Sequence, residues 1–514
     1  MPKNKIIDNG SDIYLSKSLF IRGLQCHKSL YLQKFRPELK DELTKEKENL
    51  FSTGHEVGKL AQNLFPCSIE VPYEGLSHSD QLIMTQSLIK EGHDTIYEAA
   101  FCNNGVFVKA DILNKADDGW NLYEVKASTA MKDYHVNDVS VQYHVLNGSG
   151  LPLSRAFLVH INNAYVRNGA IEIDKLFTKV DLTEIVKDRQ LFIAEEIAKE
   201  RTMLRGQEPA IDIGYQCDDP YECDFKGYCW PNIPEDSIFR LKGRFDAKFL
   251  LYRQGILSMH DVPEEHLSIN QLLQAESNRN QHIHYDREAV NAFVQSLWYP
   301  MYFLDFETFS QAIPPFDGTR PYEQIPFQYS LHFIDKEEGA LQHHEYLAVP
   351  NVDPREELVR KLLSEIPDKA CVIVYNKSFE IMILRSLASW FPAHSGQIET
   401  IISNVRDLMD PFQKKDIYHW KQNGSWSLKS VLPTLVPELS YDGLDIREGG
   451  MAGEAYRAMN RSSDQDEIEA IRRSLLEYCH LDTLAMVKIL KKLQEKAFPN
   501  TGATAGNVEQ QFQV

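Results

Sequence analysis

The chain has 514 residues, of which 43% are hydrophobic and 25% charged, and its formal net charge is -19. This length exceeds what a single hydrophobic core supports, so we expect two or three domains. The acidic balance argues against binding of nucleic acid, and because there is no long basic tract, any such binding must use local grooves and bound metal. The lack of a run of 18 apolar residues excludes a membrane-spanning helix. Because the N-terminus also lacks the apolar stretch of a secretory signal, we expect a soluble cytoplasmic protein without a membrane partner.

Residues 1–235 carry the pattern of a mixed α/β domain. Helical periodicity over residues 14–40 and 46–64 is followed by alternating apolar segments near residues 105–114 and 120–128. In the segment NLYEVKAS, Glu124 and Lys126 share one face, and Asp111 ends the preceding strand VFVKADIL. Two carboxylates and a lysine at strand ends can hold a cation and position a water molecule. The alternative is a solvent-exposed strand, which often has the same alternation of charges.

Three of the eight cysteines lie close together near the end of this domain. Cys217, Cys223 and Cys229 fall within CDDPYECDFKGYC, with five residues in each gap. In a cytoplasmic protein, cysteines grouped in this way indicate metal or redox chemistry rather than disulfides.

An early cysteine, an Asp…Glu-x-Lys pattern and three late cysteines occur in that order. This order resembles the RecB-like nucleases with an iron-sulfur cluster, which are found in AddB proteins and CRISPR-associated exonucleases. The resemblance implies a PD-(D/E)XK restriction-endonuclease-like fold in which Mg or Mn ions bind to two of the acids. The cluster would be a [4Fe-4S] cluster, with zinc as the alternative because four thiolates suit either. The implied cluster ligands are Cys26, Cys217, Cys223 and Cys229, and the implied catalytic residues are Asp111, Glu124, Lys126 and Gln142.

The catalytic motifs of that family differ from this sequence at two positions. Gly58 stands where the family commonly has a histidine, although His55 lies one helical turn earlier. Leu146 stands where the family has a tyrosine after the glutamine, although Tyr143 is adjacent to Gln142.

The rest of the chain is expected to form a connector, a second domain and a tail. Residues 236–297 have helical patterns broken at Gly255 and Pro263, which predicts a small helical connector. Between residues 298 and 497, the apolar strands MYFLDFETF, PFQYSLHFID, HHEYLAV and ACVIVYN alternate with helical segments, and this predicts a three-layer α/β domain. Residues 498–514 are small and polar, so we expect a disordered tail.

The first strand of this second domain carries two acids on one face. Asp305 and Glu307 alternate with Leu304 and Phe306, so the carboxylates lie side by side in an otherwise apolar strand. Buried like charges at this spacing are unfavourable unless they are protonated or bind a cation, and carboxylate oxygens suit divalent metals. The alternative is a strand end with two solvated acids.

Further along, NKSFEIMIL places Glu380 at a strand-to-helix junction, and Tyr478 and Asp482 lie four residues apart on one helix face. The order DxE, NxxFE, YxxxD resembles the DEDD exonucleases of the RNase H-like fold. The resemblance implies that four acids bind two metal ions and that a tyrosine orients the attacking water. The implied ligands are Asp305, Glu307, Glu380 and Asp482, with Tyr478 as the orienting residue. Since the family usually has aspartate where Glu380 stands, Asp407 is a reserve fourth acid.

As a whole, the chain resembles a largely uncharacterised bacterial family that fuses a RecB-like domain to an RNase H-like domain. The resemblance implies a metal-dependent nuclease, and we expect a DNA exonuclease that acts in repair or defence. One alternative is a nucleic-acid-binding scaffold with a decayed N-terminal nuclease core. Another is an RNase that works from the C-terminal site alone. DNA is the expected partner ahead of RNA, and the sequence leaves protein partners open.

Overall fold

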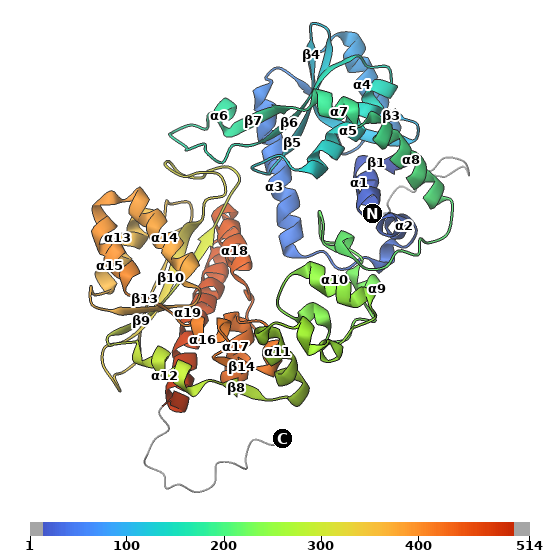
Figure 1. Ribbon diagram of the computed structural model, residues 1–514. Helices are drawn as coiled ribbons and strands as arrows, with labels where there is room; N and C mark the ends of the chain where they lie inside the picture. The colour runs from blue at the N-terminus through green and yellow to red at the C-terminus, as the bar shows by residue number, and fades with distance from the viewer. Residues whose placement is uncertain (1–13, 498–514) are drawn as a thin grey trace. The chain divides into compact units, whose positions relative to one another are not determined.

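A computed structural model of the chain describes residues 14–497 (Figure 1). The expected tail at residues 498–514 lies outside them. The chain forms two compact units, each made of two segments. The first unit combines the segment up to Asn232 with Gln311–Glu323, and the second combines Ile233–Ser310 with the segment from Gln324 onward. Over the described residues, no helix is both long and apolar enough to cross a bilayer.

The first unit combines a seven-stranded mixed sheet with helices. Its strands are β1 (Leu15–Ser16), β2 (Ile69–Glu70), β3 (Thr95–Asn103), β4 (Val106–Ala116), β5 (Gly119–Lys126), β6 (Leu153–Ile161) and β7 (Phe177–Asp181). Its helices are α1 (Lys17–Gln25), α2 (His27–Phe35), η1 (Pro37–Leu39), α3 (Lys45–Ala61), η2 (Gln62–Leu64), α4 (His78–Glu91), α5 (Asp133–Gly148), α6 (Ile173–Leu176), α7 (Thr183–Asp188), α8 (Gln190–Leu204), η3 (Tyr215–Cys217) and α9 (Lys226–Cys229).

Two hydrophobic clusters cover the two faces of this sheet. The strand order is β2-β3-β4-β5-β6-β7, with β1 added in parallel beside β4. Strands β3, β4 and β5 are antiparallel, and β6 returns through α5 to lie parallel to β5. Leu113 and Leu122 belong to the cluster that includes residues of α1, α5 and α8, whereas Ile112 and Tyr123 belong to the cluster that includes residues of α3. The period-2 alternation of the sequence therefore sets which side chains meet which helices.

The N-terminal helical segment is interrupted, so the prediction of one helix over residues 14–40 is wrong in detail. Cys26 has extended backbone angles, φ -161° and ψ 115°, and it separates α1 from α2. Its N–H bonds to the carbonyl of Arg22, and its own carbonyl accepts from the N–H of Leu30. The side chain of Cys26 therefore lies at a corner between two helices rather than along one helix.

The second unit contains a five-stranded mixed sheet, a two-stranded sheet and surrounding helices. Its strands are β8 (Ile283–Tyr285), β9 (Met301–Phe309), β10 (Ile325–Ile334), β11 (Gln342–Leu347), β12 (Cys371–Val374), β13 (Val405–Asp407) and β14 (Ile417–His419). Its helices are η4 (Ile238–Arg240), α10 (Phe245–Arg253), η5 (Met259–Asp261), η6 (Glu264–His266), α11 (Ile269–Asn280), α12 (Arg287–Gln295), α13 (Arg355–Glu365), α14 (Lys377–Trp390), η7 (Pro392–His394), α15 (Ser395–Ser403), α16 (Asp410–Gln413), η8 (Trp420–Gln422), α17 (Leu428–Leu435), α18 (Gly449–Arg461) and α19 (Gln465–Ala497).

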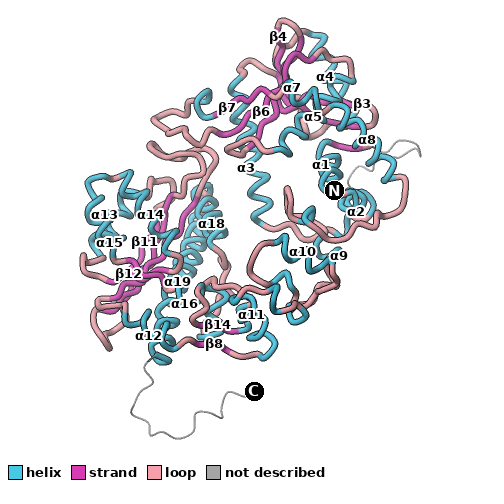
Figure 2. The backbone as a smooth tube through the Cα atoms, viewed as in Figure 1, coloured by secondary structure: helices cyan, strands magenta, loops and turns pink. Residues whose placement is uncertain are grey.

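Helices pack on both faces of the five-stranded sheet. Its order is β11-β10-β9-β12-β13, in which β10 is antiparallel to both neighbours and β12 and β13 run parallel to β9. On one face, Tyr329 donates to Glu365 of α13 at 2.6 Å. On the other, Gln328 donates to a carbonyl of α19 at 2.8 Å. Figure 2 shows α13–α15 on one side of these strands and α18 and α19 on the other. The expectation of a mixed α/β protein is confirmed.

The segment predicted as a helical connector contains a strand as well as helices. Strand β8 pairs antiparallel with β14, which lies more than 130 residues later in the sequence. Helices of this segment surround a small cluster of their own, which includes Ile238, Met259 and Ala275. A three-residue strand gives too little periodicity to be recognised in the sequence.

Candidate functional site: two polar centres and a cysteine pocket

The acids of β9 face the long helix α19. Asp305 pairs in register with Ser330 of β10, and the thiol of Cys479 on α19 lies 3.8 Å from the Asp305 Oδ2. Ligand atoms of Asp305, Glu307 and Cys479 all lie within 4.8 Å of one another. The opposite face of the strand is apolar, where Phe306 packs edge-on against Tyr329 at 6.4 Å between ring centroids. The sheet therefore directs both carboxylates to one side.

Two further acids complete this C-terminal acid centre, defined as Asp305, Glu307, Glu380 and Asp482. Glu380 is buried in the first turn of α14, and its Oε2 has no hydrogen-bond partner among residues 14–497. Burial, then Asp305 and Glu307, raise the pKa of Glu380 well above its usual value. Burial also raises the pKa of Asp482 to about 6. The pKa values of Asp305 and Glu307 are likewise raised, first by burial and then by the neighbouring carboxylates.

This electrostatic arrangement suits a divalent cation. Carboxyl groups packed together and buried hold their protons to unusually high pH, because ionisation would place like charges side by side in a poorly solvated space. A bound cation reverses that effect by stabilising the ionised oxygens. The Oε2 of Glu380 has no hydrogen-bond partner within residues 14–497, so it is a candidate ligand atom for a metal ion.

A lysine and two tyrosines border the acid centre on the α19 side. Tyr441 donates a hydrogen bond to Asp482 Oδ1. Lys429 of α17 donates to the hydroxyl of Tyr478 at 3.1 Å, and its ammonium lies over the rings of both tyrosines. Burial raises the pKa of Asp482, and the nearby charge of Lys429 opposes that rise. The side chain predicted to orient water is therefore itself held by a cation.

Sequence reasoning missed three residues that border the acid centre: Lys429, Tyr441 and Cys479. Cys479 lies three residues before Asp482 on the same helix, so helical spacing could have drawn attention to it. Lys429 and Tyr441 reach the centre from segments about 40 to 50 residues away from Tyr478 and Asp482. Such contacts arise only from the tertiary fold.

Asp407, the reserve acid, is engaged in backbone hydrogen bonds. Its carboxylate accepts from the backbone N–H groups of Asn376, Lys377 and Met409 at 2.9–3.0 Å. Asn376 has a left-handed backbone with φ 80° at the start of α14. Asp407 therefore fixes the strand-to-helix junction that presents Glu380, and it adds to the negative field that raises the pKa of Glu380.

In the first unit, an ion-pair network forms around Glu124. This N-terminal centre comprises Asp111, Glu124, Lys126, Gln142, Lys17 and Asp138. Lys126 contacts Glu124 Oε1 at 2.7 Å and Asp138 Oδ2 at 2.7 Å. Gln142 of α5 donates to Glu124 Oε2 at 2.5 Å, while its own Oε1 has no partner among the described residues.

Asp111 is held beside this network by the backbone. Its Oδ2 accepts from the N–H of Val125 at 2.7 Å. Burial, then Glu124, raise the pKa of Asp111 to about 7. Burial alone would raise the pKa of Glu124 too, but Lys126 and Lys17 outweigh it and lower that pKa. Two neighbouring acids are thus driven toward opposite protonation states.

Lys17 and Asp138 are members of the centre that sequence reasoning missed. Lys17, the first residue of α1, donates to both oxygens of Glu124 at 2.8 and 3.0 Å. Burial lowers the pKa of Lys17, yet Glu124 and Asp111 together raise it above its ordinary value. Asp138 lies one helical turn before Gln142, which was the only available sequence signal. Lys17 is more than 100 residues from Glu124 in sequence and gave none.

The positions that depart from the RecB-like motifs have ordinary structural places. His55, the stand-in for the missing motif histidine, is exposed on α3, and Gly58 has no neighbour within 4 Å of where a Cβ would lie. Leu146 and Tyr143 are buried in the cluster that α5 shares with the sheet.

The four predicted cluster ligands line one pocket. Cys26, Cys217, Cys223 and Cys229 all border it, together with Lys28 and Ser29. Burial raises the pKa of Cys229 to about 11, with Cys223, Cys217 and Cys26 adding to the rise and Lys28 opposing it. Cys229 therefore lies close enough to the other three thiols for their charges to affect its pKa. Cys67, Cys102, Cys371 and Cys479 are not among the residues that line the pocket.

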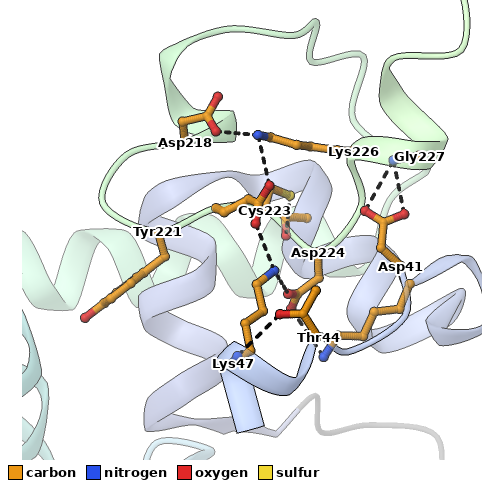
Figure 3. A network of polar contacts seen from close by, with 12 residues as sticks. Asp41, Thr44, Lys47, Asp218, Tyr221, Cys223, Asp224, Lys226 and Gly227 are labelled. Carbon is orange, nitrogen blue, oxygen red and sulfur yellow. Dashed lines mark hydrogen bonds and ion pairs between the residues drawn. The ribbon is translucent and has the colours of Figure 1, made fainter. Parts of the chain in front are cut away.

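A polar network joins the cysteine loop to the N-terminal segment (Figure 3). The N–H of Asp41 donates to the Asp224 carbonyl at 2.7 Å, and its carboxylate accepts from the N–H of Gly227 at 3.1 Å. Asp224 also pairs with Arg22 at 2.7 Å and with Lys47 at 3.4 Å. Hydrogen bonds and ion pairs therefore join the early segment of this unit to the cysteine loop.

The same loop reaches toward the N-terminal centre. Tyr221, between Cys217 and Cys223, packs against Tyr134 of α5 with ring centroids 5.0 Å apart. Burial and Tyr134 raise the pKa of Tyr221, and the charges of Asp138 and Lys126 also act on it. The cysteine loop thus contacts α5, the helix that carries Asp138 and Gln142 of the N-terminal centre.

Comparison with known proteins gives a family match for a part of the chain that lies mostly in the second unit. Residues 302–427 match a family model described as "Domain of unknown function (DUF2779)". This range contains Asp305, Glu307 and Glu380 but ends before Tyr478 and Asp482.

The chain is also similar to curated proteins that are named as uncharacterized. It is 29% identical over 223 residues to "Uncharacterized protein MG366 homolog" of Mycoplasma pneumoniae, covering 39% of this chain and 34% of that protein. It is 29% identical over 215 residues to "Uncharacterized protein MG366" of Mycoplasma genitalium, covering 38% and 32%. It is 28% identical over 247 residues to "Uncharacterized protein UU173" of Ureaplasma parvum, covering 43% and 35%. The match thus spans about a third of the length of each of these relatives.

Proposed function

We propose that this protein is a metal-dependent nuclease that hydrolyses phosphodiester bonds, with the C-terminal acid centre as its principal site. One observation carries the proposal: β9, α14 and α19 bring four carboxyl groups together in a buried space, where their pKa values are raised. Buried acids of this kind are unfavourable for stability alone, so their assembly favours a cation-binding role. The sheet order β11-β10-β9-β12-β13 is compatible with an RNase H-like domain.

The donor set fits Mg or Mn ions, which prefer carboxylate oxygens. Asp305, Glu307, Glu380 and Asp482 would hold them, and the free Oε2 of Glu380 gives one ready ligand atom. Bound ions would supply Lewis acidity for water activation and neutralise charge on the leaving oxygen. Because burial raises the pKa values of these ligands, ion binding releases protons and strengthens as pH rises.

The surrounding residues have defined parts in this proposal. Lys429 fixes the Tyr478 hydroxyl at 3.1 Å, which lets that hydroxyl orient a water molecule or a phosphate oxygen. Tyr441 holds Asp482 in one position through its hydrogen bond. Lys429 also provides a positive charge for an anionic substrate at the edge of an otherwise acidic centre.

The N-terminal centre is a second candidate nuclease site, of PD-(D/E)XK type. The specific observation in its favour is the convergence of Asp111, Glu124, Lys126 and Gln142, which come from β4, β5 and α5. The ammonium of Lys17 occupies both oxygens of Glu124, so a divalent ion must displace it. Lys126 then remains to position water beside the acids.

The cysteine pocket is proposed to hold a [4Fe-4S] cluster. The donor chemistry fits, since four thiols border a single pocket and Lys28 lies close enough to offset negative charge. Cys26 and Cys229 have raised pKa values, first through burial, so a positively charged inorganic core would be needed to stabilise their thiolates. The cluster would reinforce the loop that carries Tyr221.

Cleavage of end-labelled single- and double-stranded DNA and matching RNA tests the proposal. The full-length protein is incubated with Mn²⁺, Mg²⁺ or EDTA, as wild type and as the variants Asp305→Asn, Glu124→Gln and their combination. We expect metal-dependent release of nucleotides, with DNA preferred. Cleavage of RNA alone, lost in Asp305→Asn, would make the protein an RNase. Absence of any cleavage together with retained binding would favour the scaffold alternative.

A further inference from the structure

Three histidines meet on the face of the five-stranded sheet that α19 covers. His332 of β10 lies opposite His343 of β11 in the antiparallel register. His480 of α19 lies against both, with ring centroids 4.7 Å from His332 and 4.4 Å from His343. One ring nitrogen from each histidine lies within 4.8 Å of the others. These residues carry no role in the nuclease chemistry proposed above.

A pair of hydroxyl groups holds two of these rings in place. Ser330 and Thr483 are 2.6 Å apart. Thr483 Oγ1 is 2.7 Å from His332 Nδ1, and Ser330 Oγ is 2.9 Å from His343 Nε2. One nitrogen of each ring is therefore fixed by a hydroxyl, which leaves the second nitrogen outside these contacts. Metal-binding histidines commonly have this arrangement, in which a hydrogen bond to one nitrogen orients the ring and sets its tautomer.

The cluster also favours neutral imidazoles, which is the form that binds metals. Burial, then the neighbouring histidines, lower the pKa of His332 to about 3. Burial and His480 likewise lower the pKa of His343 to about 4. Both rings are therefore uncharged near pH 7 and have a lone pair to donate.

We propose that His332, His343 and His480 bind a transition-metal ion such as Zn²⁺, at a site separate from the acid centre. Imidazole nitrogens suit late first-row ions, whereas the carboxylates nearby suit Mg²⁺ or Mn²⁺. Zn–N bonds of about 2.0 Å in a tetrahedron place ligand nitrogens about 3.3 Å apart, so small rotations of the rings bring nitrogens that lie within 4.8 Å of one another to that spacing. His343 and His480 are only partly buried and have room to rotate, while buried His332 provides the fixed point.

Such an ion would clamp α19 onto the β10–β11 hairpin. The same helix carries Tyr478 and Asp482, so the clamp would fix the position of residues that the acid centre needs. Three histidines leave one tetrahedral position for water or another ligand. The proposal does not depend on nuclease activity, because metal binding is measured directly.

Zinc stoichiometry in matched variants tests the site in the full-length protein. Wild type, His343→Gln, His480→Gln and the control His344→Gln are dialysed against Zn²⁺ and analysed for metal content. His344 is adjacent in sequence but lies on the opposite face, 3.6 Å from Glu365. We expect each of the first two variants to hold one zinc fewer than wild type, while His344→Gln matches wild type. Zinc at the cysteines or acids is common to all four proteins and cancels. Equal zinc content in all four would overturn the proposal.

A footprint on the wild-type protein keeps the test valid if a variant misfolds. Diethylpyrocarbonate modifies accessible imidazoles, and mass spectrometry locates the modified residues. Zn²⁺ at about tenfold excess over its Kd should reduce modification of His343 and His480 by about tenfold and leave His344 unchanged. Equal modification of His343 with and without Zn²⁺ would also overturn the site.

Discussion

Replacing Asp482 with asparagine separates the two effects expected of a buried metal ligand. In the metal-free protein the Asp482 carboxylate is buried, and its pKa is raised from 3.8 to about 6. An asparagine side chain at this position does not ionise, yet its amide oxygen can still accept from Tyr441. The substitution should therefore stabilise the metal-free protein at alkaline pH while it removes metal binding.

The magnitude follows from the difference between the two pKa values of Asp482. The difference between 3.8 and about 6 is worth roughly 3 kcal/mol, at about 1.4 kcal/mol per pH unit. Because the folded-state pKa is the higher one, the folded protein binds the proton more tightly. Stability from this group is complete below pH 3.8 and is lost as pH rises toward about 6. Asp482→Asn does not lose this folding free energy, because asparagine does not ionise. Its stability relative to wild type therefore increases as pH rises to about 6 and above, up to a maximum of roughly 3 kcal/mol.

Denaturation of full-length wild type and Asp482→Asn at pH 5 and pH 8, with EDTA or Mn²⁺, measures both effects. In EDTA we expect the variant to gain stability relative to wild type between pH 5 and pH 8. With Mn²⁺ at pH 8, wild type should be stabilised through this centre and the variant should lose that part. A pH-independent difference in EDTA, combined with equal stabilisation by Mn²⁺, would refute the assignment of Asp482 as a buried ligand.

Three further predictions concern other parts of the molecule. In a Glu124→Gln background, Tyr478→Phe should retain Mn²⁺ binding but slow cleavage about 10- to 100-fold, since one oriented hydrogen bond is worth about 1–3 kcal/mol. An unchanged cleavage rate would show that Tyr478 does not orient the water molecule. In an Asp305→Asn background, Lys17→Met should increase Mn²⁺ affinity at the N-terminal centre about tenfold, equal to about 1.4 kcal/mol, as measured by calorimetry. Weaker binding of Mn²⁺ would show that Lys17 does not compete with the ion. Anaerobically purified protein should absorb broadly in the visible range. Cys26→Ala should abolish this absorption and lower the melting temperature, whereas Cys102→Ala should do neither. Metal analysis that gives one zinc and no iron per chain would show that the cysteines bind zinc instead of an iron-sulfur cluster.

Local periodicity predicted much of the secondary structure around the acid centre. The segment MYFLDFETF became β9 over Met301–Phe309, with Asp305 facing α19 and Phe306 facing the opposite side, because a strand alternates its side chains regardless of context. The two-residue strands β1 and β2 and the short strands β8 and β14 could not be found in this way, because two or three residues contain no measurable period.

The residues of the candidate sites fall into the same two groups, those recognisable from local sequence spacing and those brought together only by the fold. Acids with a short sequence pattern, such as Asp305 with Glu307, were identifiable because spacing within one element fixes their relation. Lys17 and Lys429 were not, since each reaches an acid or a tyrosine from a distant segment of the chain. Lys17 helps to lower the pKa of Glu124 and Lys429 opposes the rise in the pKa of Asp482, and only the fold reveals these contacts.

The most direct measurement compares single-turnover cleavage by proteins that all carry Glu124→Gln and are otherwise wild type, Asp305→Asn or the control Asp335→Asn. Asp335 directly follows β10, is exposed, and accepts a hydrogen bond from Gln342 at 2.9 Å. The Asp335→Asn substitution therefore removes one negative charge, as Asp305→Asn does, but outside the acid centre. Loss of a ligand that contributes several kcal/mol should slow Mn²⁺-dependent cleavage by Asp305→Asn at least about 100-fold and leave Asp335→Asn at the wild-type rate. Wild-type cleavage by folded Asp305→Asn, in a background where Glu124→Gln disables the N-terminal centre, would contradict the claim that the buried acids of β9 perform the reaction.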